Sequence, residues 1–181
     1  MLKGGYVPMA VAITGICGLI FLVGQQDLRL NANDPQVQMA EDLAGQLAAG
    51  KKAEEVVESK TVEISTSLAT YVVVFDEEGK ILKSQAVLDG KEIKIPKGIL
   101  AYTKAFSEDR VTWQPRRGVR SAVVVSRFNT GKAIGFVMVG RSLREVEKKE
   151  DLLLIQVAIG WVVTLLATLL LMLGLGEGRR R

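Results

Sequence analysis

The chain has 181 residues, with 24 Lys or Arg against 20 Asp or Glu, one cysteine and no histidine. The lack of histidine removes the commonest general base and metal ligand, and a single cysteine cannot form a disulfide within the chain. The sequence contains no pattern typical of a nucleophile elbow, a Walker loop or a metal site. We therefore expect no catalytic activity, no metal and no cofactor.

Two long apolar runs lie near the ends of the sequence. Val7–Gly24 contains 18 residues and no charge, and Leu152–Leu175 contains 24, of which Gln156 is the most polar. Because about 20 apolar residues cross a bilayer as a helix, both runs predict transmembrane helices. The first run could instead be a cleaved signal peptide, but it exceeds the usual apolar length of such peptides and no A-x-A site follows it closely.

Basic residues flank both runs on the side of the chain ends. Lys3 precedes the first run and Arg179–Arg181 follow the second, so the positive-inside rule predicts both ends in the cytoplasm. We expect the protein in the cell (inner) membrane. Residues 25–151 would lie outside the cytoplasm, and they hold 20 basic and 19 acidic residues. A nearly neutral domain argues against nucleic acid as a partner.

The predicted organisation has four parts. They are a cytoplasmic tail with the first transmembrane helix over residues 1–24, an extracytoplasmic domain over 25–151, the second transmembrane helix over 152–175 and a basic cytoplasmic tail over 176–181.

The middle segment predicts an α+β domain with an antiparallel sheet. Asp34 as N-cap and Pro35 at the first helical position begin a helix that Gly50 ends. Gly131 suits the turn of the last hairpin, and the capping-box pattern Ser142–Glu145 begins a helix that continues into the second apolar run. After this first helix, which begins at Pro35 and has about 15 residues, we expect in chain order a short helix within 61–70, strands over 71–76 and 81–84, a helix over 98–107, a short strand over 111–113, and strands over 119–128 and 133–141.

The two apolar runs also carry small residues at four-residue spacing. These are Ala10, Thr14 and Gly18 in the first run and Gly160, Thr164 and Thr168 in the second. Such spacing allows helices to approach closely. The pairing that it predicts could form within one chain or between two chains.

A membrane helix, a domain with a VVVFDEEGKI hairpin and a last strand that feeds a second membrane helix resemble the extracytoplasmic PAS-like or Cache-type sensor modules of bacterial receptors. The phrases YVVVFDEEGKILKSQAVLDG, WQPRRGVR and GFVMVGRSLREVEKKED are also similar to small bacterial membrane proteins of uncharacterised function. The resemblance implies a five-stranded antiparallel sheet with helices on one side, a small-ligand pocket against the sheet, and signalling through the second membrane helix. Because we expect no kinase or other output module after Leu175, the signal would pass to a partner.

The octapeptide WQPRRGVR at 113–120 holds most of the candidate binding residues. Arg116 and Arg120 could bind a carboxylate or phosphate through paired hydrogen bonds, and Trp113 could form the wall of a pocket. Strand alternation places Arg120 with small and apolar residues, so we expect it in the pocket with Trp113 as its neighbour. Tyr71 could present its hydroxyl to the same cavity. The alternative interpretation is a basic turn, with Tyr71 packed in the core.

These observations favour a membrane-anchored extracytoplasmic module that binds a small anionic ligand and passes a signal through the second membrane helix. The alternative is a structural or accessory subunit of a membrane protein complex. The expected partners are therefore the lipid bilayer and a membrane protein or a second copy of the chain.

Overall fold

The computed structural model describes residues 2–178, and the side chains of residues 5–174. Its contacts divide the chain into two compact units. Met1–Arg29 and Val146–Arg181 form the first, which we call the helical unit, and Leu30–Glu145 form the second, which we call the α+β unit.

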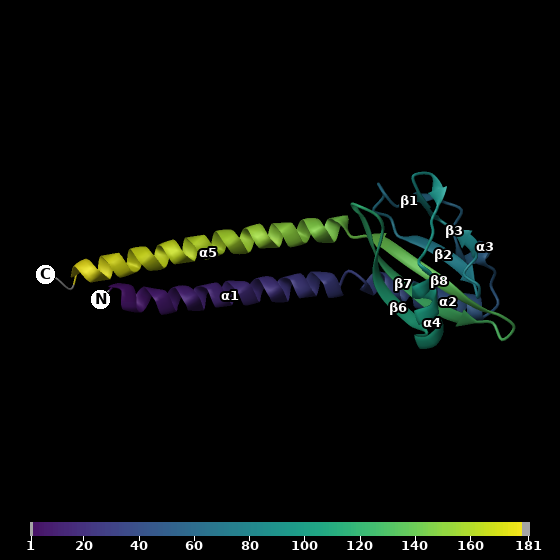
Figure 1. Cartoon of the computed structure of the whole chain (residues 1–181), viewed down its shortest axis with the longest axis horizontal. Coiled ribbons are helices and arrows are strands. Elements are labelled where there is room, and N and C mark those ends of the chain that lie inside the picture. Colours follow the sequence, from purple (N-terminus) through teal and green to yellow (C-terminus); the bar gives the residue numbers. More distant parts are fainter. Residues whose placement is uncertain (1, 179–181) are drawn as a thin grey trace. The chain divides into compact units, whose positions relative to one another are not determined.

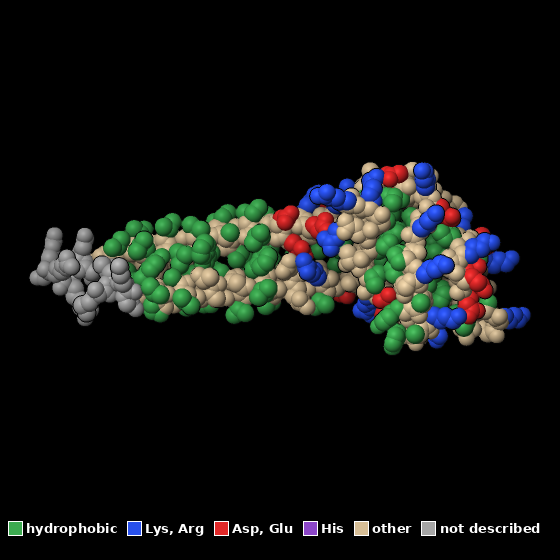
Figure 2. Space-filling model, in the orientation of Figure 1, with side chains coloured by type: hydrophobic (Ala, Val, Ile, Leu, Met, Phe, Trp, Pro, Cys, Tyr) green, Lys and Arg blue, Asp and Glu red, His purple; other side chains and the backbone are tan. Residues whose placement is uncertain are grey.

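The helical unit consists of α1 (Leu2–Leu30) and most of α5 (Arg144–Gly178), which lie side by side (Figure 1). By length and composition, two helical segments of the described chain could cross a membrane. Their apolar runs lie in α1 and α5. Figure 2 shows hydrophobic side chains along both helices, whereas charged side chains gather over the α+β unit. The predicted continuous helix from the last strand into the second apolar run is confirmed.

The α+β unit is built on a five-stranded sheet in which all neighbours are antiparallel, with the order β3-β2-β8-β7-β6. The strands are β2 (Tyr71–Asp76), β3 (Ile81–Ser84), β6 (Glu108–Arg116), β7 (Val119–Asn129) and β8 (Ile134–Ser142). Both predicted hairpins are confirmed. Gly131 has a φ of +80° in the β7–β8 turn, which is the conformation that the sequence suggested there.

Both faces of this sheet are covered, because β2, β7 and β8 are apolar on both sides. The helix α2 (Asp34–Ala48) packs its Ala40, Leu43 and Leu47 against one face. The other face carries α4 (Lys97–Phe106) and a small sheet of β1 (Val62–Glu63), β4 (Ala86–Leu88) and β5 (Lys91–Glu92). We call this second face the α4 face. The implied arrangement with helices on one side only is therefore wrong.

Four local predictions differ from the structure. The strand expected over 111–113 is longer, since β6 runs from Glu108 to Arg116. Residues 61–70 contain β1 instead of a short helix, because Val62 and Glu63 pair in parallel with β4. The short helix α3 (Ala53–Val56) lies in the charged connection after α2. Asn33, not Asp34, is the N-cap of α2, which moves Pro35 one position further into the first turn.

Candidate functional site

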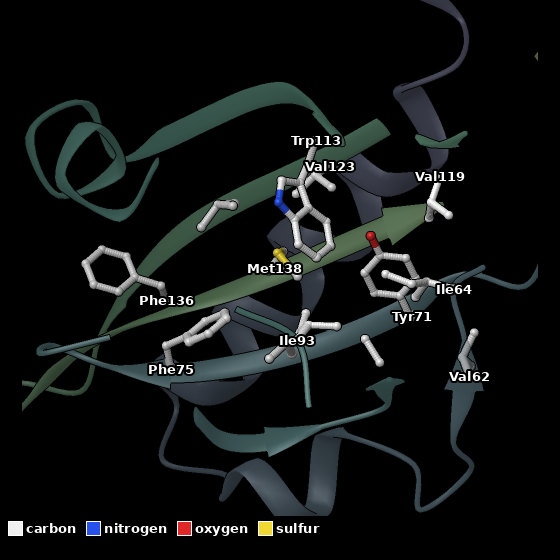
Figure 3. Packing of buried hydrophobic residues seen from close by; sticks show 13 residues of the cluster. Val62, Ile64, Tyr71, Phe75, Ile93, Trp113, Val119, Val123, Phe136 and Met138 are labelled. Atoms are coloured by element: carbon white, nitrogen blue, oxygen red, sulfur yellow. The ribbon is translucent and has the colours of Figure 1, made fainter. Parts of the chain in front are cut away.

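The α4 face brings together two of the predicted binding residues. Trp113 of β6 lies opposite Ser121 of β7, and Tyr71 of β2 lies opposite Gly140 of β8. Trp113 is 5% exposed and Tyr71 is 1% exposed, and both belong to one apolar cluster. Figure 3 shows the two rings on the same side of the sheet, with the Tyr71 hydroxyl pointing toward the side where Trp113 and Val119 lie.

The ring of Tyr71 rests on the backbone of Gly140. A Cβ at position 140 would overlap Cζ and the hydroxyl of Tyr71, so only glycine leaves room for the ring in this position. A glycine inside a strand often marks such a close approach, and this was the sequence signal that could have located the site.

Two hydroxyl groups at this site are buried and unpaired. Neither the Tyr71 hydroxyl nor the Ser121 hydroxyl has a hydrogen-bond partner among the described residues. Burial raises the pKa of Tyr71 to about 12 against a smaller lowering effect of the nearby Ser121 hydroxyl, so the group stays protonated at physiological pH. A buried hydroxyl without a partner costs free energy, and a polar group placed inside the cluster could bond to both.

A hollow of about 330 Å³ opens beside Trp113. Its wall includes Pro115, the β4–β5 turn at Asp89, and Ile93. Ile93 is 3% exposed and belongs to the same cluster as Trp113 and Tyr71. Tyr71 does not line the hollow, and Ile93 belongs both to its wall and to the cluster that contains Tyr71.

Arg116 lies at the rim of this hollow. Its Nη1 is 2.6 Å from Oδ2 of Asp89, and both side chains are about half exposed. The ion pair joins the end of β6 to the β4–β5 turn. Exposed ion pairs contribute little to stability, so this link can open at low cost.

Glu63 of β1 also holds the β4–β5 turn in place. Its carboxylate accepts hydrogen bonds from the backbone N–H groups of Asp89 and Gly90, at 3.1 and 3.0 Å, and from Ser65. The Ser65 hydroxyl bond is the largest of the effects that lower the pKa of Glu63 from 4.5 to about 2, followed by the bond from Gly90. Sequence reasoning missed these contacts with the β4–β5 turn because they join residues that are 26 and 27 positions apart.

The low pKa of Glu63 predicts a local sensitivity to acid. The carboxylate contributes stability that is complete above pH 4.5 and is lost as the pH falls toward 2. We expect Glu63→Gln to lower the thermal midpoint of the full-length protein at pH 7 and to flatten its dependence on pH between 5 and 2. Calorimetry over this range tests the effect, with Glu108→Gln as a control in an exposed ion pair on β6. Equal pH profiles for Glu63→Gln and the unaltered protein would contradict it.

Arg120 does not lie beside Trp113. Trp113 lies opposite Ser121, so both side chains are on the α4 face. Because successive residues of a strand point to opposite faces, Arg120 is on the other face of the sheet, the one that α2 covers. Its side chain is exposed. The expectation that Arg120 and Trp113 are neighbours is wrong: alternation correctly groups Arg120 with Ala122 but does not say which face the small sheet covers.

A second, larger hollow of about 630 Å³ lies further along the α4 face. Phe75 and Phe136 are at its apolar floor, and lysine and glutamate side chains surround them. Lys104 and Glu77 pair across its edge at 2.7 Å. Ile93 lines this hollow as well as the one beside Trp113, so the same short segment separates the two.

Within residues 2–178, no three histidine, cysteine, aspartate or glutamate side chains form a group that could hold a metal ion. The chain matches no family model, no curated protein and no solved structure.

Proposed function

We propose that the protein is a membrane-anchored, non-enzymatic sensory module whose α+β unit binds a small carboxylate on the α4 face. It has a PAS-like or Cache-type fold and resides in the inner membrane, with both chain ends in the cytoplasm and the α+β unit outside. The five-stranded antiparallel sheet, the two apolar helices and the basic chain ends support this reading.

One observation carries the binding proposal. Tyr71 and Ser121 keep hydroxyl groups inside an otherwise apolar cluster, although they have no partner in the described structure. Phenylalanine and alanine would fill the same space without that cost. The two hydroxyls lie close enough for Ser121 to affect the pKa of Tyr71, so one polar group of a ligand could bond to both. The adjacent hollow beside Trp113 would supply its route.

Arg116 favours a carboxylate as the charged part of the ligand. Its guanidinium already holds the carboxylate of Asp89 at the rim of the hollow, and a ligand carboxylate could take that place with paired hydrogen bonds. The apolar body of the ligand would lie against Trp113, where Ile93 now sits.

Hydrogen bonds connect this site to the start of α5. Glu63 holds the β4–β5 turn, and the following residues Thr66 and Ser67 accept hydrogen bonds from the Arg144 guanidinium through their backbone carbonyls. A ligand that moved the β4–β5 turn would thereby act on the first residue of α5. We propose that this path passes the signal to a membrane partner.

The proposal is tested by thermal shift of the full-length protein in detergent with acetate, benzoate, phenylacetate and benzylamine. We expect at least one carboxylate to raise the midpoint, and Tyr71→Phe combined with Ser121→Ala to remove that rise without lowering the basal midpoint. Tyr102→Phe, in an exposed tyrosine of α4, should keep it. The proposal fails if no probe stabilises the protein or if the rise persists in the double variant.

A second function, as an accessory subunit of a membrane complex, is favoured by an exposed aromatic pair on α4. Tyr102 and Phe106 are 50% and 66% exposed, and their ring centroids are 4.5 Å apart. Exposed aromatic side chains are enriched at protein interfaces. A pull-down from native membranes in mild detergent would favour this function if a stoichiometric partner is retained by the unaltered protein and lost with Phe106→Ser.

A further inference from the structure

The contacts between α1 and α5 use only part of the surface of α5. Nε1 of Trp161 donates to the Thr14 hydroxyl at 2.9 Å, and Nε of Arg29 lies 2.8 Å from Oε1 of Glu150. A Cβ at Gly24 would come within 2.8 Å of the Leu153 side chain. The two helices therefore approach closely where Gly24 meets Leu153, and again where Gly5 meets Met172.

The small residues Gly18 and Gly160 take no part in the close contact between α1 and α5. No described atom lies within 4 Å of the Cβ position of Gly18 or of Gly160. Pairing within the chain thus leaves these two glycines unused. Gly160 lies instead on the wall of an apolar groove of about 520 Å³ between α1 and α5, together with Cys17 and Gln156.

Gln156 is the unexplained residue of this groove. It lies one turn before Gly160 on α5, its side chain is exposed, and its amide takes part in no hydrogen bond or ion pair of the described chain. The neighbouring Thr164 hydroxyl, by contrast, donates to the Gly160 carbonyl at 2.7 Å. In hydrocarbon an amide without a hydrogen-bond partner is costly.

We propose that a second copy of the chain docks in this groove and that the two Gln156 amides bond to each other across a two-fold axis. An amide carries both a donor and an acceptor, so two copies complete each other's hydrogen bonds in a symmetric contact. Lipid chains can fill the groove but offer no partner to the amide. The open backbone at Gly160 lets the second helix approach within reach of it.

This inference rests on the membrane placement proposed above but not on ligand binding. The experiment uses the full-length protein in liposomes, labelled for energy transfer between copies and diluted over a range of protein-to-lipid ratios. We expect a reversible dimer. Gln156→Leu should raise its dissociation constant about tenfold, which corresponds to about 1.4 kcal/mol, and Gly160→Leu should block the approach and raise the constant further.

Gly18→Leu is the matched control, because Gly18 is an equally open glycine in the other apolar run and does not line the groove. A monomer in the bilayer, or equal dimerisation of all three variants and the unaltered protein, overturns the inference. Release of the protein from membranes by a carbonate wash would overturn the membrane placement itself, which separates the two failures.

Discussion

Trp113→Ala is expected to lower the free energy of unfolding of the α+β unit by about 3–5 kcal/mol, the range for a buried large aromatic side chain cut to alanine. Trp113 is 5% exposed, and its ring packs in the cluster with Val123 and Ile93. Removal of the indole loses its apolar burial and leaves a cavity that the flanking strands β6 and β7 cannot close. For a unit of this size the thermal midpoint should fall by more than about 10 °C.

Calorimetry of the full-length protein in detergent measures this loss. Tyr102→Ala, which removes a half-exposed aromatic side chain from α4, should cost much less. Free indole should partly restore the midpoint of Trp113→Ala, since an apolar cavity binds a ligand of matching shape. A midpoint that falls equally in both variants would contradict the burial of Trp113 in the core.

The strands and long helices could be predicted because each carries its own signal. Tyr71–Asp76 is β2 as expected, because it is a run of β-branched and aromatic residues. Ile81–Ser84 is β3 as expected, because the turn after Asp76 returns the chain in a hairpin. The apolar run Leu152–Leu175 lies within α5. Such signals depend only on neighbours along the chain, so the elements can be recognised without knowledge of the tertiary fold.

The small sheet could not be predicted because its stability comes from distant contacts. β1 has two residues, and it is held by its pairing with β4, by the burial of Val62 in the core, and by the hydrogen bonds that the N–H groups of the β4–β5 turn donate to Glu63. The strand and helix propensities of residues 61–70 indicate none of these contacts.

The candidate site was predicted in part. Tyr71 and Trp113 meet on the α4 face, and Arg116 lies at the rim of the hollow, but Arg120 is on the other face. Alternation along a strand sorts residues into two sets. The position of β4 and β5 decides which of the two sets faces the small sheet. Ser121 is part of the candidate site because its set faces that sheet.

Gly140→Ala is expected to destabilise the α+β unit by about 2–3 kcal/mol, as overpacking of a filled core does. The added methyl would overlap the outer ring atoms of Tyr71. That ring is buried and cannot swing into solvent, and Gly140 is paired on both sides, with Tyr71 of β2 and Val123 of β7. Neither strand can move without breaking the sheet.

A double-mutant cycle assigns the cost to this one contact. In a Tyr71→Val background the ring is absent, so we expect Gly140→Ala to cost less than about 0.5 kcal/mol there. Gly98→Ala is the matched control, because this helical glycine has open space at its Cβ position, and alanine should be neutral or stabilising by up to about 1 kcal/mol. A Gly140→Ala effect of the same size in both backgrounds would mean that the ring of Tyr71 does not rest on Gly140. The hydroxyl would then not be held at the position from which it would meet the proposed ligand.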